Sequence, residues 1–249
     1  MTFKTAYLTI DDAPSPTMTA KVDCLAARCI PAVWFCQGNH LEQRPDAALY
    51  AIRKGFVLGN HAYDHPYFSD LTLAEGFEQI RRTDEILDGL YSRAGVKRPA
   101  KYFRFPYGDK GGGTYSEVLE PYSPAGLERK QALQAYLRHL GYTQPRLDGV
   151  TYRYFRDAGL HADVDWHWTY DAMDWTVFTA QPEFGINSLD KVLARMDEDE
   201  PEGRRGLNDP RSAEIVLVHD HLNTTAFFEP IIARLVEKGL AFGLPEPSP

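Results

Sequence analysis

The stretch LTIDDAPSP, residues 8–16, places two adjacent aspartates between an apolar run and a proline-rich turn. The run AYLTI, residues 6–10, is typical of a buried strand. Two neighbouring carboxylates at the end of such a strand repel each other, because each raises the cost of ionising the other. A cation bound beside Asp12 would balance the second charge, with strand alternation aiming Asp11 elsewhere.

The rest of the chain alternates strand-like and helix-like segments. Strands are predicted over residues 6–10, 32–38, 56–61, 101–108, 164–177 and 213–221, and helices over residues 16–29, 46–55, 72–95, 126–141, 188–200 and 227–240. Regular alternation predicts parallel βαβ units in one α/β sheet or barrel. We interpret residues 1–249 as a single catalytic domain with an aromatic-rich insertion at about residues 142–165. The Gly/Pro-rich segment 108–124 is a long loop, either functional or disordered.

Composition excludes several classes of partner. The 249 residues carry a formal net charge of −8, which argues against binding to nucleic acid or to an anionic membrane. No stretch approaches the roughly 18 apolar residues that span a bilayer. No signal peptide is visible, which predicts a cytoplasmic protein, although a secreted chain trimmed of its leader would look the same. The sequence does not fix the oligomeric state.

Three cysteines, Cys24, Cys29 and Cys36, make an odd number without CxxC spacing. This pattern indicates neither a disulfide framework nor a cysteine zinc site. We expect all three to be small core residues.

Polar clusters follow the predicted strands, where parallel α/β folds place their sites. The first strand ends in the aspartate pair, the third in HAYDHP, the fourth in RFPYG, and the last two in DAMDW and LVHDH. Alone, each cluster has an ordinary explanation: a solvated turn, surface histidines, a salt-bridged turn or a capped strand end. Their occurrence at successive strand ends favours one shared site.

The histidines of the second cluster, His61 and His65, are four residues apart and lie on one face of the chain. Two imidazoles and the carboxylate of Asp12 form a common facial ligand set for a divalent transition metal with open positions. We therefore predict one such ion, zinc foremost, with cobalt, nickel or manganese as alternatives.

The ordered series TIDD, HAYDHP, RFPYG, DAMDW and LVH resembles the five motifs of the polysaccharide deacetylase family, which has the NodB homology domain and is carbohydrate esterase family 4. The resemblance implies a distorted (β/α) barrel of seven or eight strands, similar to a TIM barrel. It also implies a metal-dependent hydrolase that removes N-acetyl groups from an amino sugar, whether oligosaccharide, glycoconjugate or polysaccharide.

The same resemblance implies residue roles. Asp11 resembles the general base and Arg104 its partner, while Tyr107 resembles the residue whose backbone N–H helps to hold the oxyanion. The metal ligands would be Asp12, His61 and His65. His219 resembles the general acid, Leu217 would line the acetyl pocket, and Trp175 with Asp171 or Asp174 would orient His219. Residues three apart on a strand face opposite sides, so the sequence leaves the choice of aspartate open.

Other functions stay open. The same scaffold could open a cyclic imide or ureide, remove a formyl group, or act as an O-deacetylase such as acetylxylan esterase. A catalytically silent carbohydrate-binding protein is the third alternative. This chain departs from the family pattern at two positions. Ala62 stands where the second motif usually has Ser or Thr after its first histidine, and Ala13 stands where the first motif usually continues with Gly. The aromatic residues of the insertion region could stack on sugar rings or pack the insertion onto the barrel: Tyr152, Tyr154, Phe155, Trp166 and Trp168.

Overall fold

Strand β1 lies at the centre of a parallel sheet in this computed structural model, which describes residues 4–113, 121–199 and 206–246. The described strands are β1 (Lys4–Ala13), β2 (Ala32–Cys36), β3 (Val57–Asn60), β4 (Tyr170–Asp171), β5 (Glu214–His219) and β6 (Leu240–Phe242). Their order is β3-β2-β1-β5-β4, and β6 pairs with the first residues of β1. The carboxyl ends of β1, β2, β3 and β5 therefore meet at one rim.

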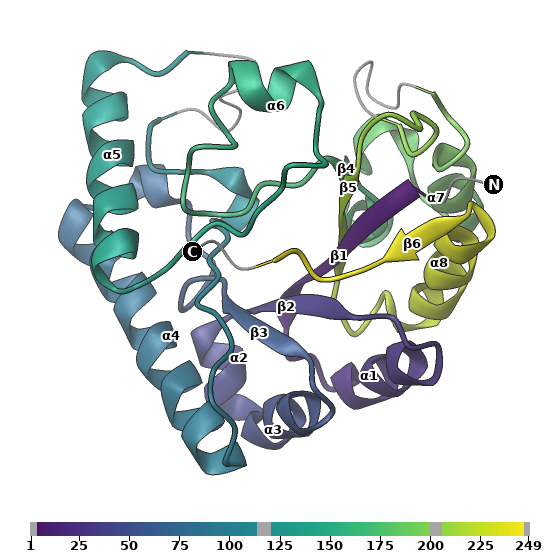
Figure 1. The fold of residues 1–249 in the computed structure, drawn as a ribbon, viewed down its shortest axis with the longest axis horizontal. Coiled ribbons are helices and arrows are strands. Elements are labelled where there is room, and N and C mark those ends of the chain that lie inside the picture. Colours follow the sequence, from purple (N-terminus) through teal and green to yellow (C-terminus); the bar gives the residue numbers. More distant parts are fainter. Residues whose placement is uncertain (1–3, 114–120, 200–205, 247–249) are drawn as a thin grey trace.

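Helices surround the strands (Figure 1). They are α1 (Met18–Ala27), α2 (Gly38–Gln43), α3 (Pro45–Arg53), α4 (Leu73–Ala94), α5 (Pro124–His139), α6 (Arg153–Asp157), α7 (Leu189–Arg195) and α8 (Thr225–Glu237), with short 3₁₀ helices η1 (Phe68–Asp70), η2 (Pro106–Gly108), η3 (Asp174–Phe178) and η4 (Glu183–Gly185). α4 begins with a capping box, in which Thr72 and Glu75 exchange hydrogen bonds. Gly55 follows α3 with a φ of +88°, as expected for a glycine that ends a helix.

Two predicted strands are wrong in extent. Residues 101–108 form only an isolated bridge between Phe103 and Asn60, and η2 begins at Pro106, which has no N–H to donate. Of residues 164–177, only β4 is a strand, and the chain then turns into η3.

These irregular segments nevertheless continue the backbone hydrogen bonding from one edge of the sheet to the other. Arg104 N–H donates to the Asn60 carbonyl at 3.0 Å, and Trp166 N–H donates to the Phe103 carbonyl at 2.8 Å. Thr169 N–H then donates to Ile215 of β5 at 2.9 Å. Hydrogen bonds thus lead from β3 back to β5 through short extended pieces, so the sheet curls into a distorted barrel with one poorly regular side.

The cysteine prediction holds for one residue. Cys36, the last residue of β2, is buried in the core, and Cys24 is partly buried and packs against that core. Cys29 is exposed, which corrects the expectation of a core residue. It lies in the turn after α1 with a φ of +52°, where the chain reverses at the surface.

The insertion, residues 142–165, packs against the barrel. Phe155 and Trp166 are each 1% exposed, and the Trp166 ring lies 5.8 Å from Phe35 and 4.8 Å from Tyr102. Sugar stacking is therefore wrong for these two residues, because a buried ring has no free face. In the loop 108–124, residues 114–120 lie outside the described chain. Among the described helices, none is both long and apolar enough to cross a membrane.

Candidate active site

The aspartate pair lies where β1 becomes irregular. The register of β1 against β2 shifts between Ile10 and Ala13, and Asp12 has a φ of +67°. A bulge interrupts strand alternation, so successive side chains need not face opposite sides. His61 Nε2 accordingly lies 3.5 Å from Asp11 Oδ2 and 3.7 Å from Asp12 Oδ1. The expectation that alternation separates the two carboxylates is wrong, because the bulge brings both to one cluster.

The three predicted metal ligands lie together. One donor atom from each of Asp12, His61 and His65 lies within 4.8 Å of the others, and His65 Nε2 is 3.1 Å from Asp12 Oδ1. His61 Nδ1 is 2.8 Å from the Arg104 carbonyl oxygen, which fixes the ring with Nε2 toward the aspartates. His65 and Ala62 both have φ of +62°, a costly conformation that concentrates at functional sites.

The protonation states suit a metal. Burial lowers the pKa of His65 to about 4, so its imidazole is neutral at pH 7. Burial alone would raise the pKa of Asp12, but the hydrogen bond from His221 and the three nearby histidines His65, His61 and His219 together outweigh burial and hold the pKa well below its ordinary value. A neutral imidazole and an ionised carboxylate are the forms that bind metal ions. The donor set therefore fits a divalent transition metal.

Asp11 is fixed by a buried arginine. Arg104 Nη1 donates to Asp11 Oδ1 at 2.9 Å and to Thr9 Oγ1 at 2.8 Å, and its Nε donates to the Trp166 carbonyl at 3.1 Å. The guanidinium carbon also lies 4.4 Å from the centre of the Phe35 ring. Four contacts leave this guanidinium little freedom, so Asp11 has a fixed orientation and a balanced charge.

On the neighbouring strand, His219 of β5 contacts Asp174. Its Nδ1 lies 2.9 Å from Asp174 Oδ1, and its backbone N–H donates to Asp174 Oδ2 at 3.2 Å. Burial disfavours the charged ring, but the Asp174 carboxylate prevails and raises the pKa of His219 to about 10. Of the two aspartates that the sequence left open, Asp174 is thus the one that contacts His219.

Asp171 has a different set of partners. It accepts hydrogen bonds from Met173 N–H at 2.7 Å and from Trp175 Nε1 at 3.2 Å. Burial raises the pKa of Asp171. The Trp175 ring lies 6.4 Å from the His219 ring, edge toward face, and the charge of Asp171 contributes to the raised pKa of His219.

The two remaining predicted residues lie at the same rim. Leu217 is buried in β5, two residues before His219, and therefore faces the same side of the strand. Tyr107 is 46% exposed, has a φ of +58° and stacks on Tyr67 with ring centres 3.9 Å apart. Its ring centre also lies 4.4 Å from that of His65.

Sequence reasoning missed three residues that hold Asp12 or its surroundings. His221 Nε2 lies 2.7 Å from Asp12 Oδ2, and Gln37 Nε2 donates to Asp12 Oδ1 at 2.7 Å. Asp220 is buried and contacts Ser15, in the loop after β1, and Lys21 of α1. The signal for His221 was present in LVHDH, since residues two apart at a strand end face the same side.

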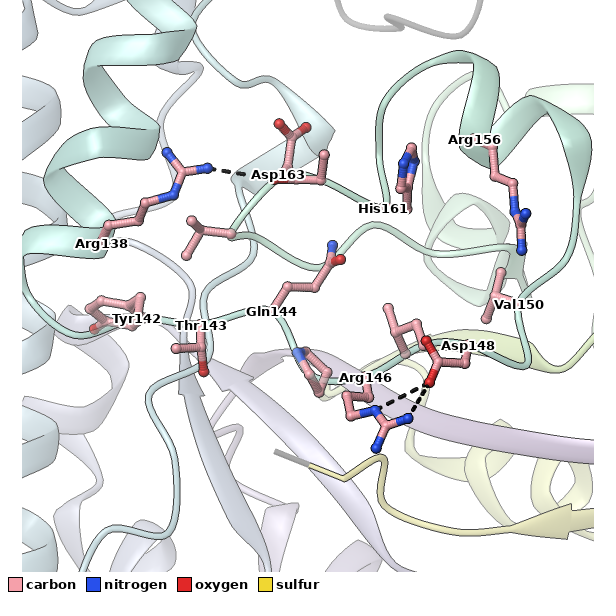
Figure 2. A pocket seen from close by; sticks show the side chains of 14 residues that line it. Arg138, Tyr142, Thr143, Gln144, Arg146, Asp148, Val150, Arg156, His161 and Asp163 are labelled. Atoms are coloured by element: carbon pink, nitrogen blue, oxygen red, sulfur yellow. Dashed lines mark hydrogen bonds and ion pairs between the residues drawn. The ribbon is translucent and has the colours of Figure 1, made fainter. Parts of the chain in front are cut away.

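A cavity of about 680 Å³ lies elsewhere, lined by residues 138–164 (Figure 2). Its lining includes Thr143, whose N–H donates to Lys101, and Arg146, which pairs with Asp148 at 2.7 Å. Lys101 lies three residues before Arg104 in the extended segment that reaches the site rim at Arg104. The cavity next to Lys101 therefore lies toward the opposite rim, at the amino ends of the strands. The described lining includes none of the predicted site residues.

Comparisons with known proteins agree with this architecture. The family model described as polysaccharide deacetylase matches residues 1–143, more than half of the chain. YheN of Bacillus subtilis (strain 168) is 26% identical over 243 residues, which are 98% of this chain and 67% of YheN. The peptidoglycan-N-acetylglucosamine deacetylase of Bacillus cereus is 35% identical over 103 residues, 41% of this chain and 36% of that protein.

A solved structure extends the likeness to the whole fold. The family 4 carbohydrate esterase from Streptomyces lividans, in complex with acetate, matches with a TM-score of 0.60 and 24% identity. The match covers 97% of this chain and 92% of that one. It confirms the predicted fold class, an α/β protein with a distorted barrel.

Proposed function

Because the chain belongs to the polysaccharide deacetylase family, we propose that it is a metal-dependent hydrolase that removes N-acetyl groups from an N-acetylated amino sugar. One observation carries this proposal. Asp11 and His219 are register partners on the adjacent parallel strands β1 and β5, beside the donor set of Asp12, His61 and His65. A base and an acid on one side of a metal site are what hydrolysis of an amide requires.

Each residue then has a defined task. A divalent ion held by Asp12, His61 and His65 would polarise the acetyl carbonyl and lower the pKa of water. Asp11, held by Arg104, accepts a proton from the water that attacks the carbonyl carbon. The backbone N–H of Tyr107 is the proposed donor to the oxyanion that forms.

The second half of the reaction belongs to His219. Its Nδ1 is held by Asp174, so Nε2 is the atom that can give a proton to the leaving nitrogen. With a pKa of about 10, the ring carries that proton at neutral pH. Transfer breaks the C–N bond and releases acetate and a free amine. Leu217 is the proposed wall of the acetyl pocket.

The names of the relatives support an amino-sugar substrate. The Bacillus cereus relative is named for N-acetylglucosamine in peptidoglycan, and a similar protein of Rhizobium leguminosarum bv. trifolii for chitooligosaccharide. An O-deacetylase is the second candidate, because a bifunctional xylanase/xylan deacetylase of Cellvibrio japonicus is 29% identical over 103 residues. Both chemistries use the same base and metal.

The test is a substrate screen on protein stripped of metal and reloaded with zinc, cobalt, nickel or manganese. Substrates are N-acetylated chitooligosaccharides, peptidoglycan fragments, acetylated xylan, N-formyl sugars and cyclic imides and ureides. We expect acetate and free amine in equal amounts from an N-acetylated sugar, and neither from Asp12→Ala or after chelation. Acetate release undiminished by chelation would overturn the proposal, and acetate from xylan alone would favour the O-deacetylase.

A further inference from the structure

The loop that follows β5 begins with residues 220 and 221 and is bonded to the end of β1 and to the loop after it. Asp220 N–H donates to the Asp11 carbonyl at 2.8 Å. The Asp220 carboxylate accepts from Ser15 N–H at Oδ2 and from Ser15 Oγ at Oδ1, each at 2.7 Å. The ends of the two strands that carry the proposed base and acid are therefore joined by backbone and side-chain hydrogen bonds.

A lysine from α1 completes the fastening. Lys21 Nζ lies 2.6 Å from Asp220 Oδ1 and donates to the His221 carbonyl at 3.0 Å. The two charged side chains are 2% and 0% exposed. Burying an ion pair is costly, and such a pair persists only where its geometry and further hydrogen bonds compensate. Here those bonds fix the backbone on both sides of the His221 side chain.

The consequence falls on Asp12. His221 Nε2 lies 2.7 Å from Asp12 Oδ2, while Oδ1 accepts from Gln37 at 2.7 Å and lies 3.1 Å from His65 Nε2. Each carboxylate oxygen thus has its own partner, and only Oδ1 faces the metal-binding histidines. The His221 side chain is 34% exposed, so burial does not force the ring to point toward Asp12.

We propose that His221 is a positioning residue for the metal site: its ring N–H holds Asp12 Oδ2 so that Oδ1 faces the ion. The buried Lys21–Asp220 pair in turn holds His221. This inference rests on the proposed function only in that a metal binds at Asp12, His61 and His65. Removing the hydrogen-bonded partner of a metal ligand typically weakens metal binding by about 10- to 100-fold.

The test measures cobalt binding directly, by calorimetry and by the visible absorption of Co²⁺, on metal-free protein. His221→Ala is expected to raise the Co²⁺ dissociation constant about 10- to 100-fold while the absorption spectrum at saturation stays that of the wild type. His221→Gln keeps an N–H donor and is expected to restore most of the affinity. His161→Ala, an exposed histidine that lines the distant cavity, is the matched control and should change nothing.

The outcomes separate this role from the proposed function. Unchanged cobalt affinity in His221→Ala overturns the positioning role and leaves the function intact. An altered saturated spectrum also overturns it, because His221 would then be a ligand itself. A wild-type chain that binds no Co²⁺ overturns the proposed function and this role together.

A double-mutant cycle tests the support from Lys21. Lys21→Met removes the charge but keeps most of the side-chain volume, and it is expected to weaken Co²⁺ binding. If Lys21 acts through His221, the double variant binds Co²⁺ no more weakly than His221→Ala alone. Additive losses would overturn the link. Urea unfolding of each variant reports whether the fold persists, and the His221→Ala and His221→Gln comparison stands if Lys21→Met does not fold.

Discussion

Two aspartate–histidine clusters lie at the same rim of the barrel and differ in their protonation. In each of them, Asp12/His61/His65 and Asp171/Asp174/His219, donor atoms lie within 4.8 Å of one another. By residue type and spacing alone, both are candidate metal sites. Yet the pKa of His65 is lowered to about 4, and that of His219 is raised to about 10.

The difference comes from the partners of each imidazole. His65 Nε2 lies 3.1 Å from one carboxylate, Asp12, with the His61 ring beside it, whereas His219 Nδ1 lies 2.9 Å from the Asp174 carboxylate, with the charges of Asp171 and Asp12 nearby. At His65 the effect of burial, which lowers the pKa, is larger than that of the nearby carboxylates. At His219 the carboxylates raise the pKa more than burial lowers it. A neutral ring has a lone pair for a metal, and a charged ring has a proton to give. The same residue types therefore divide into a ligand set and an acid.

The largest expected effect separates the neighbouring aspartates. Asp12→Ala should lose bound metal and reduce acetate release to background, because a ligand is gone. Asp11→Asn should keep the metal but lower turnover about 10²- to 10⁴-fold, the usual contribution of a general base. Metal content by atomic absorption and acetate release by a coupled assay measure the two effects. An Asp11→Asn variant with near-native turnover would contradict the assignment of the base.

Substitutions in the Asp171/Asp174/His219 cluster should lower the activity of the protein without loss of bound metal. Asp174→Asn removes the charge that raises the pKa of His219, so less of the histidine carries its proton at neutral pH. We expect turnover to fall about 10- to 100-fold and the alkaline limb of the pH–rate profile to move to lower pH. Asp171→Asn, which keeps Asp174, is the matched comparison and should move the limb less. A limb that moves more in Asp171→Asn would reverse the assignment.

The residues of the metal cluster could be found from the sequence because each follows a strand. Parallel strands bring their carboxyl ends together, so the sequence alone predicts Asp12, His61 and His65 at one rim. Strand alternation does not choose between Asp171 and Asp174, because it indicates that they face opposite sides but not which of them faces His219. The chain leaves β4 at Asp171 and turns through Met173, with a φ of +59°, into η3. Alternation does not hold across such a turn.

What the sequence did not reveal depends on contacts distant in the chain. The pairing of Asp12 with His221 spans 209 positions, and that of Lys21 with Asp220 spans 199. Local spacing in LVHDH indicates that His221 faces the same side as His219, but no local pattern reports which distant residues these side chains contact. The predicted strand over residues 101–108 failed for a related reason: its apolar side chains suit a strand, but its neighbours offer only one bridge pair, at Phe103.

Opposite protonation also predicts opposite effects of pH on stability in metal-free protein. The folded pKa of His219, about 10, is above its ordinary value of 6.5. Its stabilisation is therefore complete below pH 6.5 and is lost as the pH rises through about 10. The folded pKa of His65, about 4, is below 6.5, so stability is lost as the pH falls from 6.5 toward 4.

Urea unfolding of the metal-free chain between pH 4 and pH 10 measures both effects. Asp174→Asn should flatten the alkaline fall in the free energy of unfolding and leave the acid side alone. His65→Gln should do the reverse. Equal flattening of both sides by either variant would mean that the two clusters titrate as one, contrary to the comparison.

The smallest effect is expected at Trp175, the residue that links Asp171 to His219. Trp175→Phe keeps an aromatic ring near the histidine but removes the Nε1–H that donates to Asp171 at 3.2 Å. A hydrogen bond to a charged group contributes about 1.5 to 3 kcal/mol to stability, but this bond is long and does not involve the acid itself, so kcat/KM should fall less than about tenfold with metal content unchanged. Steady-state kinetics at pH 7 measure the loss. A fall as large as that of Asp174→Asn would mean that the acid is oriented by Asp171 and Trp175 together, and the direct contact with Asp174 would then not suffice to set the state of His219.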